Sequence, residues 1–215
     1  MKRLALLFSV LYSFSALAQA GYEIKVTMRP FKNRFIYLGH YFGKQYPIID
    51  SAMLNDKSEA VFKGSAKLPG GIYLVGYPDK AGFFEILIDK QQRFSLVADT
   101  ATISKGAQFS NSSDNVLFNS YQQYMSAKGR EIYEDQQKYK ASKNAADSAH
   151  WKDELEKLDK TVRDYRENLI KNNPGNILTA LLVAMREPDM PEKWKNPKNK
   201  KDSLEAFYFY KDHQR

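Results

Sequence analysis

Residues 71–98 read GIYLVGYPDKAGFFEILIDKQQRFSLVA, and this stretch decides the fold that the sequence predicts. It contains three short apolar runs, Gly71–Tyr77, Phe83–Ile88 and Phe94–Ala98, separated by Pro-Asp-Lys-Ala-Gly and Asp-Lys-Gln-Gln. Short runs that are rich in β-branched and aromatic residues and bounded by turn residues are typical of β-strands. The stretch therefore predicts three consecutive strands with no helix between them.

The same pattern extends back to residue 22. Four further runs of this kind precede the quoted stretch: Tyr22–Met28, Phe35–Tyr41, Ile48–Met53 and Ala60–Lys63. Seven short strands at regular spacing favour an antiparallel β-sandwich over residues 21–108. Parallel strands need long crossover connections, usually helices, for which there is no room, so we expect none here.

The spacing of the apolar residues changes near Ser110, and residues 109–187 predict an all-helical segment. Polar residues at 111–114 are candidate N-caps of a first helix, which has apolar residues at 117, 118, 121, 124 and 125 on one face. The predicted fold class is therefore α+β, a sandwich followed by helices.

Two further helices are predicted in this segment. The first runs from about Asp147 to Lys171 and is ended by Asn-Asn-Pro-Gly at residues 172–175. Its polar face is charged, and Glu156 precedes Lys160 in the favourable i,i+4 order. The second is the apolar run Ile177–Met185.

Residues 188–215 predict a linker and a truncated C-terminal helix. The linker covers the polar stretch Pro191–Lys201, and the helix starts at about Ser203. Its aromatic run, residues 207–210, has little sequence around it that could bury it. We therefore expect a larger architecture that is interrupted at Arg215.

The first 20 residues have the three parts of a secretory signal peptide. Lys2 and Arg3 form a positive start, an apolar stretch follows, and Ala18-Gln19-Ala20 supplies a cleavage site. The apolar stretch is short for a transmembrane helix, which needs roughly 20 residues. Its alternative is an N-terminal core helix. Because no Cys stands at the cleavage point, we expect an exported, soluble periplasmic protein with no lipid or membrane anchor after cleavage.

Charge and cysteine content exclude several classes of function. The net charge is +8, but basic and acidic residues are mixed along the chain, which argues against a nucleic-acid-binding stripe. The chain contains no Cys, so it has no disulfide to stabilise it and no thiol for redox chemistry.

No arrangement of residues predicts catalysis, a cofactor or a metal site. His40, His150 and His213 have none of the spacings of metal-binding motifs, and GxSxG is absent. Gly70-Gly71 is typical of a turn rather than a phosphate-binding loop. The carboxylates are scattered through turns and strand ends, and no pattern selects a pair. We therefore expect a protein that is not an enzyme.

One group of aromatic residues predicts a binding surface. A small region of the sheet contains six of them: Tyr37, Tyr41, Phe42, Tyr46, Tyr73 and Tyr77. Aromatic rings exposed on a sandwich can stack on sugar rings or peptides, so the expected partner is an unknown protein or small ligand in the periplasm. The alternative is that these side chains form the core of the sandwich.

The first half of the chain resembles the family called domain of unknown function 4369. The residues that carry the resemblance are Tyr22–Val26, Ile36–Leu38, Ile48–Ala52, Val61–Gly64, Leu68–Tyr73 and Phe84–Asp89. The helical part is similar to the second segment of the same proteins, through Ile170–Pro174 and the stretch 182–188. The resemblance implies the β-rich N-terminal region of an exported thioredoxin-like protein, of the thiol–disulfide oxidoreductase and peroxiredoxin-related class.

The chain departs from that class at the feature that performs its chemistry. Full-length members continue into a thioredoxin fold with a Cys-x-x-Cys pair, and this chain has no Cys. Two hypotheses follow: a non-catalytic periplasmic accessory or binding domain, or a truncated oxidoreductase whose Cys-x-x-Cys domain is missing. The DNA downstream of the Arg215 codon distinguishes them.

Overall fold

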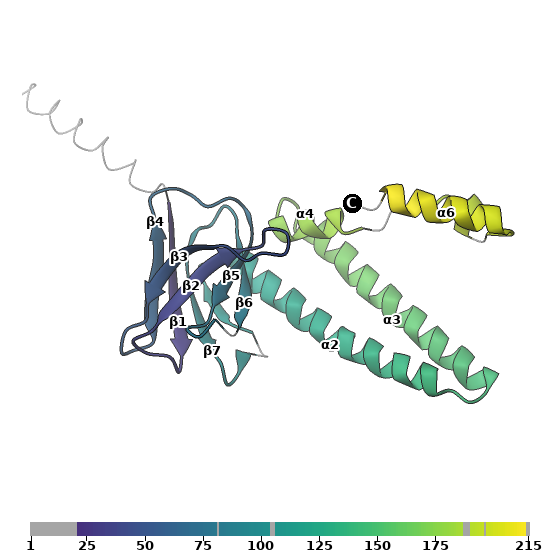
Figure 1. The fold of residues 1–215 in the computed structure, drawn as a ribbon, viewed down its shortest axis with the longest axis horizontal. Helices are drawn as coiled ribbons and strands as arrows, with labels where there is room; N and C mark the ends of the chain where they lie inside the picture. Colours follow the sequence, from purple (N-terminus) through teal and green to yellow (C-terminus); the bar gives the residue numbers. More distant parts are fainter. Residues whose placement is uncertain (1–20, 81, 104–105, 187–189, 196, 214–215) are drawn as a thin grey trace, which may run out of the picture. The chain divides into compact units, whose positions relative to one another are not determined.

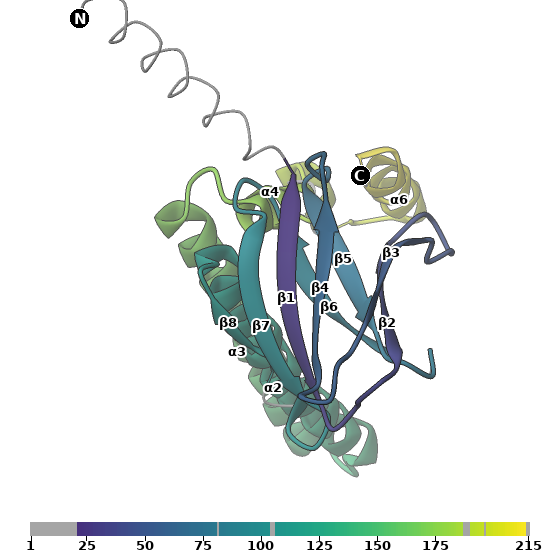
Figure 2. The same cartoon turned by 90° about the vertical axis from the view of Figure 1, so that its left-hand side faces the viewer.

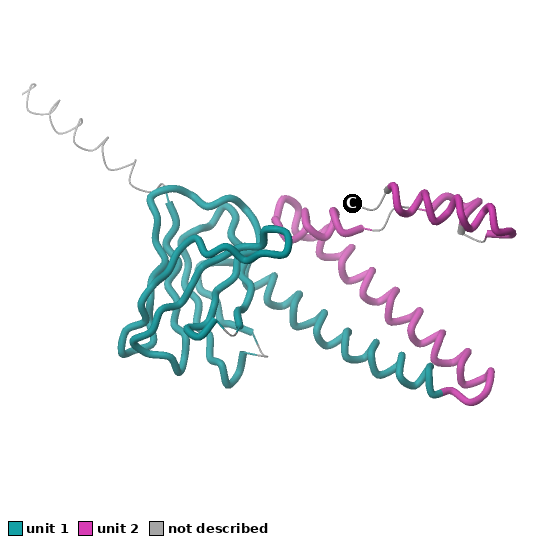
Figure 3. The backbone as a smooth tube through the Cα atoms, in the orientation of Figure 1, with its two compact units in different colours: residues 1–141 teal, residues 142–215 magenta. Residues whose placement is uncertain are grey.

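The computed structural model describes residues 21–80, 82–103, 106–186, 190–195 and 197–213. The predicted signal peptide, residues 1–20, lies outside the described residues. The chain divides into two compact units, residues 1–141 and residues 142–215 (Figure 3). The sandwich and the helix that follows it belong to the first unit.

Eight strands of the first unit form two four-stranded sheets that pack face to face (Figures 1 and 2). Sheet A has the strand order β4-β1-β7-β8, and sheet B has the order β3-β2-β5-β6. The strands are β1 Tyr22–Arg29, β2 Phe35–His40, β3 Ile48–Met53, β4 Glu59–Gly64, β5 Gly71–Gly76, β6 Phe83–Ile88, β7 Arg93–Asp99 and β8 Gln108–Ser110. The predicted α+β fold is confirmed, and the ends of β1 to β7 agree with the prediction to within one residue.

One pair of strands corrects the expectation that no strands run parallel. β1 and β7 are parallel, from Glu23 opposite Arg93 to Arg29 opposite Asp99. A parallel pair needs a long crossover, and here the five strands between β1 and β7 provide it in place of a helix. The other described pairs are antiparallel.

Alternation along the strands sends every second side chain into the space between the sheets. In β1, Ile24, Val26 and Met28 are buried, and in β2 Ile36 and Leu38 are buried. The buried apolar side chains of both sheets form a single core. Burial at about 25 cal/mol per Å² of apolar surface makes this core the main source of stability.

A hydrogen bond joins the two sheets near one edge of the core. The hydroxyl of Tyr22, in β1, donates to Oδ2 of Asp50, in β3, over 2.7 Å. Burial first, and then this hydrogen bond, raise the pKa of Tyr22 to about 12.

Helix α2, Ser113–Ala141, lies against β6 and β8, which are the edge strands of the two sheets. It begins where the polar residues predicted a cap, because the Ser112 hydroxyl accepts a hydrogen bond from the Asn115 amide nitrogen (3.3 Å). The Asn115 side chain is fully buried. It accepts from Leu87 N and donates to Leu87 O, both over 2.7 Å. An amide side chain thus continues the hydrogen-bonded ladder of β6 where solvent does not reach.

The second unit contains four helices among its described residues. They are α3 Ala145–Asn172, α4 Ile177–Ala184, α5 Glu192–Lys195 and α6 Lys200–His213. Asn144 caps α3 by accepting from Asp147 N (2.9 Å), and Asn176 caps α4 by accepting from Leu178 N (2.8 Å). α3 ends before the Asn-Pro-Gly sequence as predicted, with Gly175 at a φ of +76°.

The predicted linker is partly helical, which corrects the expectation of a simple polar stretch. α5 lies within it, and α6 begins at Lys200, before the predicted start. The ring centroids of Trp194, in α5, and Phe209, in α6, are 4.9 Å apart, so the linker helix buries part of the aromatic run. Phe207 and Tyr208 stay 61% and 51% exposed, as the sequence indicated. No helix in the described part of the chain is both long and apolar enough to cross a bilayer.

Candidate functional site

The outer face of sheet B carries large apolar side chains. Because Ile36 and Leu38 of β2 point inward, the residues between and beside them point outward. Exposed side chains from three strands line this face: Phe35 is 47% exposed, Ile48 50%, Met53 50% and Phe83 42%. The solvated face of an antiparallel sheet is normally polar, so this face is the first candidate for a binding surface.

A bulge places Ile48 on this face. The register of β2 against β3 shifts between Leu38, which is opposite Asp50, and Gly39, which is opposite Ile48. One extra residue of β3, Ile49, is accommodated there, and a single-residue shift exchanges the two faces of a strand. Ile48 therefore shares the outer face with Tyr37.

Three aromatic rings pack together at one end of the face. The centroids of Tyr41 and Tyr46 are 5.4 Å apart, those of Tyr46 and Phe83 5.5 Å, and those of Tyr41 and Phe83 6.5 Å. All three side chains remain at least two-fifths exposed. Edge-to-face contacts of Tyr41 with both other rings, and a tilted contact between Tyr46 and Phe83, hold the rings in place and leave part of their surface open.

A tight turn positions the two tyrosines. Phe42 and Gln45 exchange backbone hydrogen bonds of 2.9 and 3.0 Å. Gly43 between them has a φ of +59°, in the left-handed region that favours glycine. The turn brings Tyr41 and Tyr46, which flank the bridged pair, to the same side of the sheet.

A groove of about 310 Å³ lies beside these rings. Gly39 and Gly76 lack side chains, and the buried Leu74 of β5 stands opposite Gly39 on the same face, so the three residues form its floor. Its sides include Tyr37, Tyr46, Ile48, Lys80, Gly82 and Phe83. A Cβ at Gly39 would lie 2.8 Å from the carbonyl oxygen of Pro47, so the loop that carries Tyr46 can approach only a glycine there.

The polar contacts of the ring cluster run toward α2. The hydroxyl of Tyr41 donates a short hydrogen bond to Oε1 of Glu85, and Gln122 Nε2, on α2, donates to Oε2 of the same carboxylate over 2.7 Å. Burial first, and then the hydrogen bond to Glu85, raise the pKa of Tyr41 above its ordinary value. Glu85 is thereby fixed as a structural acceptor between the face and the helix.

The structure separates the six aromatic residues that the sequence grouped together. Tyr37, Tyr41 and Tyr46 come together on the outer face, and Phe42, 69% exposed, lies in the adjacent turn. Tyr73 is 4% exposed and its hydroxyl donates to Pro69 O (2.8 Å), while Tyr77 packs against the core beside Phe84. Tyr73 and Tyr77 therefore lie on the core side. For these two residues the alternative prediction, that the aromatic side chains form the core of the sandwich, is the correct one.

Only Tyr37 and Tyr46 of the nine residues that line the groove were among the candidates, and two of the others, Phe83 and Lys80, supply an aromatic ring and a charge. Phe83 is followed directly by Phe84, which packs against the core, so local sequence does not indicate which of the two rings points outward. Lys80 follows a turn, and its Nζ lies over the Tyr37 ring, 4.7 Å from the centroid. Both residues belong to the β5–β6 hairpin, and the pairing of β2 with β5 brings Tyr37 to them. Local sequence does not indicate which distant strands pair.

The outer face of sheet A differs in chemistry. The Glu23 carboxylate lies within 3.5 to 3.7 Å of the charged nitrogens of Lys25, Lys63 and Arg93. Desolvation acts to raise the pKa of Glu23, but the positive charges of Lys63, Lys25 and Arg93 outweigh it and lower that pKa. This face thus carries a network of charges, beside which Val61 and Val97 are 45% and 36% exposed.

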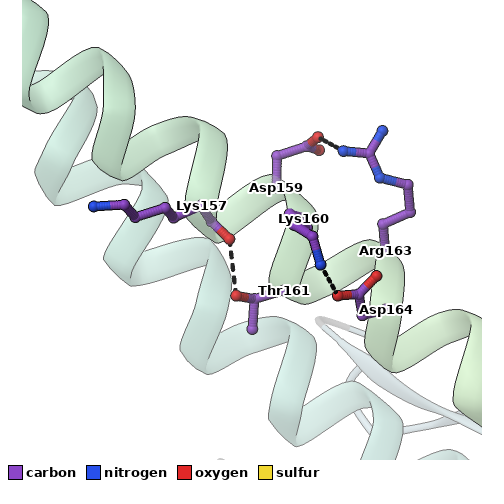
Figure 4. Close-up of polar contacts among 6 residues, drawn as sticks. All are labelled: Lys157, Asp159, Lys160, Thr161, Arg163 and Asp164. Atoms are coloured by element: carbon purple, nitrogen blue, oxygen red, sulfur yellow. Dashed lines mark hydrogen bonds and ion pairs between the residues drawn. The ribbon is translucent and has the colours of Figure 1, made fainter.

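Helix α3 has a similarly charged and solvated face (Figure 4). Lys160 pairs with Asp164 (2.6 Å) and Arg163 with Asp159 (2.8 Å), whereas Glu156 pairs with Lys152 (3.7 Å). The Glu156–Lys160 pair suggested by the sequence is therefore replaced by neighbouring i,i+4 pairs. These side chains are more than half exposed, so the pairs contribute little individually.

The two histidines whose side chains are described make separate contacts. His40 contacts the Tyr41 carbonyl oxygen through Nδ1 (3.0 Å), and His150 packs on Trp151. The side chain of His213 lies outside the described residues. Among the described residues, no three His, Cys, Asp or Glu side chains are grouped as metal ligands would be.

Comparison of the chain with protein-family models, with curated proteins and with solved structures finds no match. The outer face of sheet B is therefore described by its geometry alone, as an open apolar surface on a β-sandwich.

Proposed function

We propose that this chain is a non-catalytic binding domain whose ligand docks on the outer face of sheet B. The observation that carries the proposal is the cluster of Tyr41, Tyr46 and Phe83, which stays exposed beside a groove with a glycine floor. Covering such rings removes apolar surface from water and gives a directional stacking contact. Sugar rings and peptide side chains are the ligand classes that use this chemistry.

We further propose that the domain acts after export, as an accessory to thiol–disulfide chemistry that other proteins perform. Two sequence features support this part of the proposal. The first 20 residues have the pattern of a signal peptide, and residues 22–89 resemble the N-terminal region of exported thioredoxin-like proteins. Since the chain has no Cys, it takes part by binding. Turnover of the purified chain in an insulin-reduction assay would contradict this assignment.

Glycan and peptide arrays probed with the labelled chain test the proposal. Three proteins are compared: the wild type, a Tyr46→Ser/Phe83→Ser double variant, and a Val61→Ser/Val97→Ser double variant on the outer face of sheet A. We expect retention on a class of glycans or peptides that the first double variant loses and the second keeps. Absence of binding, or equal loss in both double variants, would show that the face of sheet B is not a binding surface.

A further inference from the structure

The groove of sheet B combines an apolar interior with a single charged side chain. Resting on the proposed function, we propose that it takes a small ligand with an apolar body and one anionic group, and that Lys80 holds the anion. The proposed function allows any ligand that stacks on an aromatic surface. The present proposal restricts the ligand to a small, free acid with an apolar body. The shape of the groove and the charges around it support this proposal independently.

The shape of the groove favours a small ligand over a protein surface. Its volume, about 310 Å³, is at the lower end of the range for small-molecule pockets. The floor contains Gly39 and Gly76, which have no side chains, and the Tyr46 and Phe83 rings stand beside it. A single aromatic ring or a short chain could lie over this floor beside the two rings, whereas a flat protein surface would rest on the rings without filling the floor.

The charges around the groove favour an anion. Of the nine residues that line it, Lys80 is the only charged one. Its ammonium lies over the Tyr37 ring and, within the described part of the chain, takes part in no ion pair. Asp79 precedes Lys80 but does not line the groove, and Glu85 is already bound by Tyr41 and Gln122. An anionic group at this end would therefore meet one cation and no competing carboxylate.

Three probes that share one apolar body test the charge. They are 4-phenylbutyrate, 4-phenylbutyramide and 4-phenylbutylamine, which are anionic, neutral and cationic. Dissociation constants of the full chain are measured by titration of its backbone amide NMR signals. We expect the anion to bind about two- to fivefold more tightly than the amide, as a partly exposed ion pair allows, and the amine to bind most weakly.

A matched pair of lysine variants separates a local contact from the net charge of the protein. Lys80→Gln should remove the preference for 4-phenylbutyrate over the amide and leave amide binding unchanged. Lys67→Gln removes the same charge from the loop before β5, at the other end of that strand, and should keep the preference. An equal effect of the two variants would overturn the role of Lys80.

Filling the groove tests the site itself. A Cβ at Gly76 would lie 3.5 Å from the Tyr37 Cβ, an ordinary contact, so Gly76→Val fits the strand and occupies the floor. It should abolish binding of all three probes. Phe83→Ser, which removes one side of the groove, gives the same test if Gly76→Val does not fold.

The possible failures are distinguishable. Equal binding of the three probes, blocked by Gly76→Val, would overturn the anionic ligand and leave the proposed binding face intact. No binding of any probe would contradict the groove as a ligand site, and the arrays would then decide the broader function. Stronger retention on anionic vesicles than on neutral ones, unaffected by Gly76→Val, would show instead that Lys80 serves a membrane surface.

Discussion

The two outer faces of the sandwich differ in chemistry although their strands share one core, because sheet A carries charges beside two smaller exposed residues, Val61 and Val97. On sheet A the outward residues of β1, β4 and β7 include Glu23 with its three cationic neighbours. On sheet B the corresponding positions of β2, β3 and β6 carry Phe35, Met53 and Phe83, which are 42 to 50% exposed.

This comparison distinguishes the inward residues, which folding requires, from the outward residues, which are available for a binding function. Folding needs only the inward half of each strand, since both sheets bury Ile, Leu, Val and Phe in the same core. The outward half is free to be charged, as on sheet A. The apolar surface that these residues of sheet B leave exposed gives the isolated domain no burial energy, and the proposed binding function supplies a reason for it.

Truncation of an inward residue should be costly on either sheet. Ile24→Ala on sheet A and Ile36→Ala on sheet B each remove a fully buried side chain. We expect each to lower the free energy of unfolding by about 2–5 kcal/mol, from lost transfer energy and a residual cavity. Urea denaturation followed by circular dichroism measures both. A loss below about 1 kcal/mol for only one of them would mean that the sheets do not share a core.

The hydrogen bonds between Leu87 of sheet B and Asn115 of α2 should be the next most sensitive to substitution. Asn115→Ala leaves the amide and carbonyl of Leu87 without their partners, and an unpaired buried polar group costs about 1–3 kcal/mol. We expect a loss in this range, with faster hydrogen exchange at Leu87. Ser120→Ala, on an exposed site of the same helix, serves as the control and should leave both measurements nearly unchanged.

Substitutions of outward residues should lower the free energy of unfolding less than either of these. The two faces should differ in the effect of such substitutions on ligand binding rather than on stability. Phe83→Ser should lower the free energy of unfolding by about 1 kcal/mol, because it removes contacts with Tyr41 and Tyr46. Val97→Ser on sheet A should cost about 0.5 kcal/mol. A loss of several kcal/mol for Phe83→Ser in thermal or urea unfolding would make the ring structural and weaken its assignment to a site.

The smallest effect concerns the charges of sheet A and depends on pH. Because its pKa is lowered in the folded state, Glu23 stabilises the fold above its ordinary value of 4.5 and loses that contribution as the pH falls through the folded pKa. Glu23→Gln should therefore be less stable than the wild type near neutral pH, and the two should converge in acid. Urea midpoints measured across this range test it. A constant difference between them at every pH would contradict the electrostatic cause.

The sequence predicted the strands well because each one is bounded by turn residues and rich in β-formers. It missed β8, since three residues with one inward ring, Phe109, are too short for a pattern. It also excluded the parallel pair, because the crossover that β2 to β6 provide depends on how they divide between two sheets. Pairing over such sequence distances is a property of the whole core.

Alternation in the sequence indicates the outward direction of some candidate aromatic residues but not of others. Tyr37 stands between Ile36 and Leu38, so alternation sends its ring outward. Tyr73 stands in the continuous apolar run 72–75, where neither face is marked as polar. The groove itself required the register that sets Gly76 opposite Tyr37 and Phe83, which no local pattern contains.

The most direct test of the binding face is a map of where a neutral aromatic probe contacts the sandwich. Amide NMR signals of the full chain are followed during titration with 4-phenylbutyramide. We predict shifts at outward positions of sheet B, such as Tyr37, Ile48 and Phe83, with Lys25, Lys63 and Arg93 of sheet A unmoved. Shifts on sheet A, or on both faces alike, would contradict the account.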